Sequence, residues 1–184
     1  KIIGLIFLKF SFINNKIYIY ITKFIMTKKI ALITGVSGQD GAYLAKFLLK
    51  KNYKVIGVER RSARSNNWRL EKLKINDQVI IEDLDIKEIN NIIRIFKKYK
   101  INEVYNLAAQ SFVHSSFQNP IETCQVNAIG VLNLLEVIRN EKRKIKFYQA
   151  STSEMFGMHG KKDQDEGTLF HPRSPYASSK AFAH

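Results

Sequence analysis

From residue 29 onward, short apolar runs alternate with longer stretches whose apolar residues recur every three or four positions. The short runs are typical of buried strands, and the longer stretches are typical of helices with one buried face. The runs predict strands at residues 30–34, 55–58, 79–81, 104–107 and 146–149. The helical spacing predicts helices at about residues 41–51, 89–96 and 121–138, and a last helix that begins at Ser174-Pro175.

The alternation of strands and helices predicts the fold class, because two parallel strands need a crossover connection between them. We expect an α/β fold with a doubly wound parallel sheet, right-handed crossovers and helices on both faces. Asn119 followed by Pro120 is typical of a helix start, with the asparagine side chain as the cap.

The first 25 residues differ from the rest of the chain in composition. They contain four lysines and no acidic residue, and apolar positions alternate within residues 17–21. A signal peptide would have one apolar core and a small-residue cleavage site, and Lys9 and Lys16 interrupt the segment too often for a membrane-spanning helix. Because Met26 directly precedes the first strong strand, we interpret residues 1–25 as an upstream extension and residues 26–184 as the domain.

The formal net charge of +14 raises the question of a nucleic-acid or membrane partner. The lysines stand singly among isoleucines and asparagines, with no basic cluster beside an aromatic platform. Since phosphate binding without sequence preference needs a concentrated basic face, we expect neither nucleic acid nor a membrane as a partner.

Cysteine and histidine usage argues against disulfides and metal sites. Cys124 is the single cysteine, so no intramolecular disulfide can form, and we expect its side chain to be buried. The histidines at positions 114, 159 and 171 lack the spacing of metal ligands, so no metal is expected. A single thiol fits a reducing compartment, and we expect a cytoplasmic protein.

The segment after the first predicted strand carries glycines at spacings of three and three, followed by a helix. Side chains at these glycines would block the approach of a pyrophosphate or the packing of helix on strand. The helix N-terminus offers free N–H groups and a partial positive charge to phosphates. An ordinary turn is the alternative, but the strand–glycine–helix context favours a dinucleotide site. The expected cofactor-binding residues here are Gly35, Ser37, Gly38, Gln39, Asp40 and Gly41.

The choice between NAD and NADP depends on the end of the second predicted strand, where a carboxylate favours NAD and an arginine favours NADP. The sequence has Glu59, Arg60 and Arg61 at this place. The arginine pair would bind the 2′-phosphate of NADP, and Glu59 is the discordant residue. An ordinary solvated charge run is the alternative interpretation, and we expect NADP.

Two polar clusters follow the fifth predicted strand, where residues face the ligand crevice of a doubly wound sheet. The first is the run ASTSEMFG at residues 150–157, and the second contains Tyr176 and Lys180 on one helix face. A nearby cation favours the phenolate form of a tyrosine. Keeping a tyrosine ionised three units below its ordinary pKa requires roughly 4 kcal/mol. A lysine and an oxidised nicotinamide can supply this stabilisation; a purely structural pair is the alternative.

Several segments together resemble the GDP-mannose 4,6-dehydratases, a family of the extended short-chain dehydrogenase/reductases with a Rossmann-like fold. They are LITG and GQDG (32–35 and 38–41), RRS (60–62), YNLAAQSFV (105–113), FYQASTSE (147–154) and PRSPY (172–176). The resemblance runs from about residue 28 to the last residue. Glu59 and the Ala-Ser-Ser between Tyr176 and Lys180 depart from the family's commoner pattern.

The resemblance implies dehydration of GDP-D-mannose to GDP-4-dehydro-6-deoxy-D-mannose through transient hydride transfer to NADP. It implies that Tyr176, helped by Lys180 and hydrogen-bonded with Thr152, takes the proton of the sugar 4-hydroxyl. Glu154 then removes the C5 proton, water leaves from C6, and the hydride returns to C6. Oxidation needs one base and elimination needs a second at another carbon, so Glu154 distinguishes a dehydratase from a plain dehydrogenase or epimerase.

The resemblance also implies further cofactor contacts. Asp83 and Leu84 would flank the adenine, and the residues that would line the cofactor elsewhere are Leu107, Ala109, Ser111 and Lys180.

The chain ends four residues after Lys180, so we expect an enzyme whose substrate domain is missing here and a piece that is inactive alone. A homo-oligomer is expected, because in relatives the helices at residues 121–138 and from Tyr176 onward lie at a subunit interface. One alternative is another nucleotide-sugar epimerase or 4-keto-reductase of the same superfamily. The other is a non-catalytic NADP-binding regulator, which would usually lack the tyrosine or the lysine.

Overall fold

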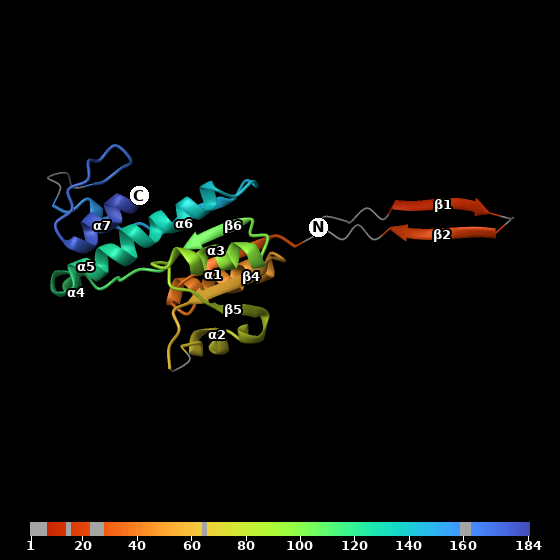
Figure 1. The fold of residues 1–184 in the computed structure, drawn as a ribbon, viewed down its shortest axis with the longest axis horizontal. Coiled ribbons are helices and arrows are strands. Elements are labelled where there is room, and N and C mark those ends of the chain that lie inside the picture. Colours follow the sequence, from red (N-terminus) through yellow and green to blue (C-terminus); the bar gives the residue numbers. More distant parts are fainter. Residues whose placement is uncertain (1–6, 14–15, 23–27, 64–65, 159–162) are drawn as a thin grey trace.

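The computed structural model describes residues 7–13, 16–22, 28–63, 66–158 and 163–184. Its centre is a five-stranded parallel sheet in the order β5-β4-β3-β6-β7 (Figure 1). The strands are β3 (Ile30–Thr34), β4 (Lys54–Glu59), β5 (Val79–Asp83), β6 (Glu103–Asn106) and β7 (Lys146–Gln149). The predicted strands and the doubly wound order are therefore confirmed, with ends that differ by at most two residues.

The two faces of the sheet are buried by different helices. On one face, Leu32 and Ile56 belong to an apolar cluster that includes residues of α3 (Ile89–Lys98) and α6 (Gly130–Arg139). On the other face, Ile33 and Val55 belong to a cluster that includes residues of α1 (Gln39–Lys50) and α2 (Trp68–Lys72). Successive strand residues point to opposite faces, so a continuous apolar run such as β3 supplies both cores.

The long predicted helix is one continuous helical stretch with an irregular middle. It comprises α5 (Pro120–Cys124), the π-helical segment η2 (Gln125–Ile129) and α6. By length and composition, residues 120–139 could span a membrane, but part of this stretch is buried and α6 packs against α3. A core helix of a soluble protein has the same properties.

Two details near this helix differ from the prediction. The Asn119 side chain makes no cap hydrogen bond, because its backbone (φ −131°, ψ 60°) lies outside the extended region typical of a cap. Its carbonyl instead accepts hydrogen bonds from the N–H and the hydroxyl of Thr123. Cys124 is exposed, not buried, because its neighbour Thr123 takes the inward position on α5.

Two further helices lie near the carboxyl ends of the strands. One is in a segment whose sequence has little periodicity, and the other follows a clear start signal. The sequence did not predict α4 (Val113–Gln118), a short helix next to α5 and α7. It did predict the start of α7 (Pro175–Ala183), whose cap Ser174 accepts the N–H of Ala177 at 3.0 Å. Short 3-10 helices, η1 (Asn76–Gln78) and η3 (Ser153–Met155), complete the fold.

The first segment of the chain forms a separate two-stranded antiparallel sheet of β1 (Phe7–Ile13) and β2 (Lys16–Thr22). The sequence did not predict this hairpin, and an isolated hairpin is only marginally stable in water. The expectation that the natural protein begins at Met26 stays a prediction, because Met26 lies outside the described residues.

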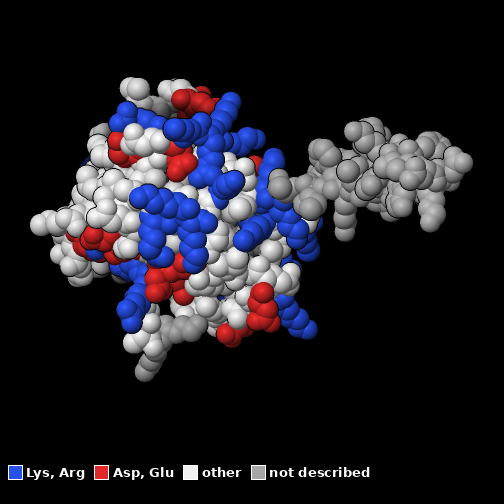
Figure 2. Space-filling view, turned by 45° about the vertical axis from the view of Figure 1, so that its right-hand side comes forward, with Lys and Arg blue, Asp and Glu red and all other residues white. Residues whose placement is uncertain are grey.

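The charged surface contains ion pairs as well as single lysines. Figure 2 shows Lys and Arg side chains over much of the face drawn, with Asp and Glu side chains among them. Lys98 and Arg94 contact Glu82 at 2.5 and 3.4 Å, and Arg143 contacts Glu141 at 2.9 Å. The expectation that neither nucleic acid nor a membrane binds here stays a prediction.

Candidate active site

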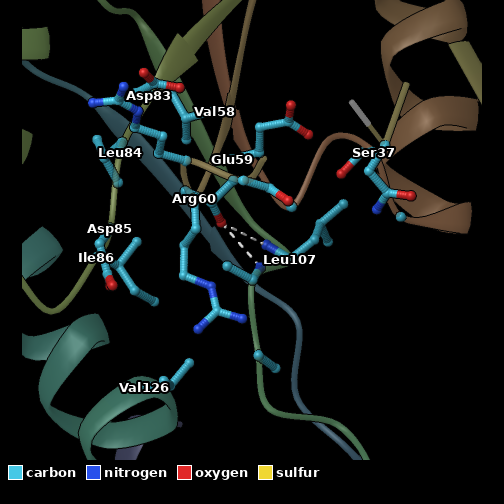
Figure 3. A pocket seen from close by; sticks show the side chains of 18 of the residues that line it. Ser37, Val58, Glu59, Arg60, Asp83, Leu84, Asp85, Ile86, Leu107 and Val126 are labelled. Atoms are coloured by element: carbon cyan, nitrogen blue, oxygen red, sulfur yellow. Dashed lines mark hydrogen bonds between the residues drawn. The ribbon is translucent and has the colours of Figure 1, made fainter. Parts of the chain in front are cut away.

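A cleft of about 1410 Å³ opens at the carboxyl ends of β3, β4, β5 and β6 (Figure 3). The chain turns in opposite directions on the two sides of β3, since β4 lies on one side and β6 on the other. Ligands of open α/β sheets bind at such a switch point. Of the predicted cofactor-binding residues, ten line this cleft: Gly35, Ser37, Gly38, Arg60, Arg61, Asp83, Leu84, Leu107, Ala109 and Ser111.

The glycine turn has the backbone that the sequence predicted. Gly35 has a φ of +68°, and a Cβ on it would lie 3.1 Å from both the Leu107 carbonyl carbon and the Ala108 nitrogen. A Cβ on Gly41 would lie 2.3 Å from the Gly35 oxygen and 2.7 Å from the Val36 Cα. Both glycines are therefore required where they stand: Gly35 for the turn and the approach of β6, and Gly41 for the packing of α1 on the turn.

The N-terminus of α1 lies beside this turn. The helix begins at Gln39, two residues before the predicted start, and Gly38 caps it without a side chain. No side-chain cap satisfies the first N–H groups of the helix, as a phosphate-binding helix start requires. Four of the predicted cofactor-binding residues do not line the cleft: Gln39, Asp40, Gly41 and Lys180.

Among the residues that the structure describes, three arginines line the cleft, and the sequence had indicated two of them, Arg60 and Arg61. Arg60 extends into the cleft, with a guanidinium nitrogen 3.8 Å from Glu122 of α5 (Figure 3). Arg94 of α3 donates to the Asp83 carbonyl at 2.6 Å, and Glu59 also lines the cleft. No spacing in the sequence connects Arg94 or Glu122 with the strand ends, because only the packing of their helices brings them there.

The predicted acid–base residues lie at the end of β7 and on α7. Thr152 precedes η3, and its hydroxyl oxygen accepts the N–H of Glu154 at 3.2 Å. Glu154 is exposed and lines a smaller cavity of about 500 Å³ together with Ser153, Gly157, Met158, Gln164 and Arg173. Tyr176 and Lys180 are both buried, at 8% and 3% exposure.

Backbone contacts tie these two segments together. The His171 N–H donates to the Met155 carbonyl at 2.9 Å, which holds the segment leading to α7 against η3. The ammonium of Lys180 donates to the carbonyl of Ala150, directly after β7. The helix α7 also packs against η3. Tyr176 lines neither of the two cavities, so the structure places Tyr176 and Glu154 on touching elements but not in one cavity.

The buried position of Lys180 affects its protonation. Burial lowers the pKa of the Lys180 ammonium below its ordinary value, because water no longer solvates the charge. Within the part of the chain that the structure describes, no ion pair involves this lysine. A neutral carbonyl therefore supplies the hydrogen bond that the buried ammonium makes.

Comparisons with known proteins agree with this geometry. A family model described as GDP-mannose 4,6 dehydratase matches residues 32–184. A GDP-mannose 4,6-dehydratase of Vibrio cholerae is 48% identical over 168 residues, which cover 86% of this chain and 44% of that protein. GDP-mannose 4,6 dehydratase 1 of Arabidopsis thaliana is 46% identical over 167 residues, covering 85% and 46%. The chain thus spans less than half the length of these relatives.

Solved structures show the same fold at lower identity. UDP-glucose 4-epimerase of Thermotoga maritima, with UDP-glucose, has a TM-score of 0.73 at 29% identity and covers 84% of this chain and 48% of that one. A Thermus thermophilus UDP-glucose 4-epimerase in complex with NAD has a TM-score of 0.72 at 27% identity, with the same coverage.

Proposed function

The chain belongs to the GDP-mannose 4,6-dehydratase family, and we propose that the protein carrying it dehydrates GDP-D-mannose to GDP-4-dehydro-6-deoxy-D-mannose with NADP. The observation that carries the proposal is the match of residues 32–184, which includes the glycine turn, Thr152, Glu154, Tyr176 and Lys180. Relatives at 44–48% identity bear the same name, and this favours dehydration over the epimerase or reductase alternative. Since the chain spans less than half of them, the activity is proposed for the whole protein.

The cleft fits a nicotinamide dinucleotide. The glycine turn has close backbone contacts that a Cβ at Gly35 or Gly41 would block, and the uncapped start of α1 faces a pyrophosphate in such folds. A relative in fold, the Thermus thermophilus epimerase, is in complex with NAD. Arg60 and Arg61 on the cleft wall support NADP, since they can pair with a 2′-phosphate, and Glu59 beside them is the discordant group.

A bound nicotinamide supplies the hydride acceptor and donor of the reaction. The chain's own residues supply the proton transfers. Tyr176 takes the proton of the sugar 4-hydroxyl, and Lys180, four residues along the same helix, places a buried ammonium on the same helix face. Thr152 accepts the Glu154 N–H and keeps its own hydroxyl hydrogen to donate toward the substrate.

Glu154 removes the proton at C5, which the 4-keto group has acidified. Its carboxylate is exposed, so it can meet a sugar that lies over the smaller cavity beside η3. The hydrogen bond from the Glu154 N–H to the Thr152 hydroxyl caps the start of η3, the 3-10 helix that carries Glu154. Two bases on touching elements match a reaction that removes one proton from the 4-hydroxyl oxygen and another from C5.

Product analysis with the full-length protein tests the proposal. GDP-mannose and NADP should give a stable 4-keto-6-deoxy sugar without net formation of NADPH; a 4-epimer or a reduced sugar would support the alternative. Glu154→Gln should retain cofactor binding and lose about 100-fold or more of turnover, as expected for a lost general base. Glu166→Gln, an exposed carboxylate further along the chain, is the control that should leave turnover unchanged.

We further propose that the protein self-associates and is cytoplasmic. Large apolar side chains are exposed along the stretch from α5 to α6, where Ile121, Ile129, Leu132 and Leu135 are 74, 46, 48 and 40% exposed. Such a surface is typical of an interface, and a second copy of the chain is the proposed partner. The single exposed thiol of Cys124 is compatible with a reducing compartment.

A further inference from the structure

A line of side-chain hydrogen bonds crosses the carboxyl ends of three neighbouring strands. The Thr34 hydroxyl, at the end of β3, donates to the side-chain amide oxygen of Asn106 in β6 at 2.5 Å. The Asn106 amide donates to the Gln149 side-chain oxygen of β7 at 2.8 Å, and the Gln149 amide donates to the Ala150 carbonyl at 3.1 Å. The same carbonyl accepts the ammonium of Lys180.

The direction of every bond in this line is determined by its ends. The Thr34 oxygen accepts the N–H groups of Leu107 and Ala108 at 3.1 and 3.0 Å, so its one hydrogen points to Asn106. The amide of Asn106 must then donate to Gln149, and the amide of Gln149 must donate to Ala150. Thr34 and Asn106 are 1% and 0% exposed, so water does not compete for the bond between them.

The line ends at a place where the strand ladder stops. The Ala150 N–H donates to the Asn106 carbonyl at 3.1 Å, but Ala150 itself lies one residue beyond β7. Its carbonyl is held by two side-chain donors, Gln149 and Lys180. If the Gln149 amide were removed, the Ala150 carbonyl would lose one of the two donors that fix its orientation.

We infer that Asn106 and Gln149 are positioning residues for Lys180, and that they couple its ammonium to the glycine turn through Thr34. The inference rests on the proposed role of Lys180 beside Tyr176. Thr34 directly precedes Gly35 and holds the backbone of Leu107, which lines the cofactor cleft (Figure 3). The chain of hydrogen bonds that begins at Thr34, beside the glycine turn, thus fixes the position of the Lys180 ammonium.

Two substitutions at Gln149 of the full-length protein test this inference. Gln149→Met keeps the length of the side chain and removes both polar atoms, so the Ala150 carbonyl loses its fixed direction. Gln149→Glu still accepts from Asn106 and adds a carboxylate near Lys180, which raises the pKa of that lysine. Reactivity of Lys180 toward acetic anhydride, followed by mass spectrometry across pH, reports on the lysine without any turnover.

We expect acetylation of Lys180 to become several-fold faster in Gln149→Met and slower than wild type in Gln149→Glu. In Gln149→Met, kcat should fall about fivefold, as for one lost hydrogen bond, with KM for GDP-mannose little changed. Tyr105→Phe is the control: it removes a hydroxyl bonded to Glu103 at the other end of β6 and should leave both readouts unchanged.

Two results would overturn the inference. One is a Lys180 reactivity that is the same in wild type and both Gln149 variants, and the other is an equal change in Tyr105→Phe. The proposed function fails separately, if wild type forms no 4-keto-6-deoxy product while the Lys180 reactivities change as expected. In that case the line of hydrogen bonds still positions Lys180, but for another reaction.

Discussion

Replacing Gly41 by alanine tests whether the glycine turn has the geometry on which cofactor binding depends. Gly41 lies in the first turn of α1 and is buried against the loop that it follows. The new methyl group would lie 2.3 Å from the Gly35 oxygen, 2.7 Å from the Val36 Cα and 3.0 Å from the Gly35 carbonyl carbon. All three are backbone atoms, so no side-chain rotation can relieve the contacts.

Two effects of the substitution oppose each other. Alanine favours the helix over glycine by about 1 kcal/mol. Overpacking of a buried site costs about 1–3 kcal/mol, and more where backbone must move. Since ordinary contacts of a Cβ lie beyond 3.4 Å, an approach of 2.3 Å places this site at the upper end of that range. We expect a net destabilisation of about 1–2 kcal/mol, together with a displaced turn.

The assay combines urea unfolding with calorimetric titration of NADP. Gly41→Ala should lower the unfolding midpoint and weaken NADP binding about tenfold or more, because the displaced turn no longer admits the pyrophosphate. Gly38→Ala should have a smaller effect, since its Cβ would meet one atom, the Gly35 oxygen, at 3.1 Å. Gly167→Ala is the control, with 3.5 Å to its nearest neighbour. If Gly41→Ala binds NADP as wild type does, the turn is not the phosphate site.

Three further predictions concern the cofactor, the stability and the assembly. Replacing Arg60 and Arg61 together by serine should weaken NADP binding by about tenfold for each lost charged contact, with NAD binding unchanged in calorimetry. Burial opposes the ionisation of Glu103, but hydrogen bonds from two tyrosines and the charges of nearby lysines outweigh it and lower its pKa below 4.5. Glu103→Gln should therefore cost about 1–3 kcal/mol in urea unfolding at pH 7, and this cost should shrink as the pH falls below about 4.5. Leu132→Glu should convert the proposed oligomer into monomers in analytical ultracentrifugation, since this side chain is 48% exposed on the proposed interface.

Controls and contradicting results for these three predictions are as follows. Arg139→Ser removes an exposed arginine paired with Glu136, outside the cleft, and should leave NADP binding unchanged; equal loss of NAD and NADP in the double variant would refute the 2′-phosphate role. A cost of Glu103→Gln that stays constant down to pH 3 would show that ionisation of this carboxyl does not stabilise the fold. Leu169→Glu, at 76% exposure, should not change the assembly. An oligomer that persists in Leu132→Glu would place the interface elsewhere.

The sequence predicted those parts of the site that depend on local backbone requirements. The turn at Gly35 needs a positive φ and the start of α1 needs Gly41 without a side chain, and both requirements are visible as glycine spacing. The strand ends followed from apolar runs bounded by polar residues, and the start of α7 followed from Ser174-Pro175. Each of these features involves residues within a few positions of one another.

The parts that the sequence did not predict depend on packing between distant segments. Arg94 reaches the cleft because α3 packs beside β5, and Glu122 reaches Arg60 because α5 lies across the opening. The hydrogen bond between Asn106 and Gln149 joins residues 43 positions apart in neighbouring parallel strands. Cys124 is exposed because tertiary packing, not its apolar character, decides which side of α5 faces inward.

The most direct test of the proposed dehydration follows a deuterium atom at C4 of GDP-mannose. The full-length protein with a catalytic amount of NADP should give a 4-keto-6-deoxy product that carries the deuterium at C6. This result requires oxidation at C4, elimination across C5 and C6, and return of the same hydride. Deuterium that stays at C4 in a 6-hydroxylated sugar, or a reaction that stops once all the NADP has become deuterated NADPH, would contradict the dehydratase assignment.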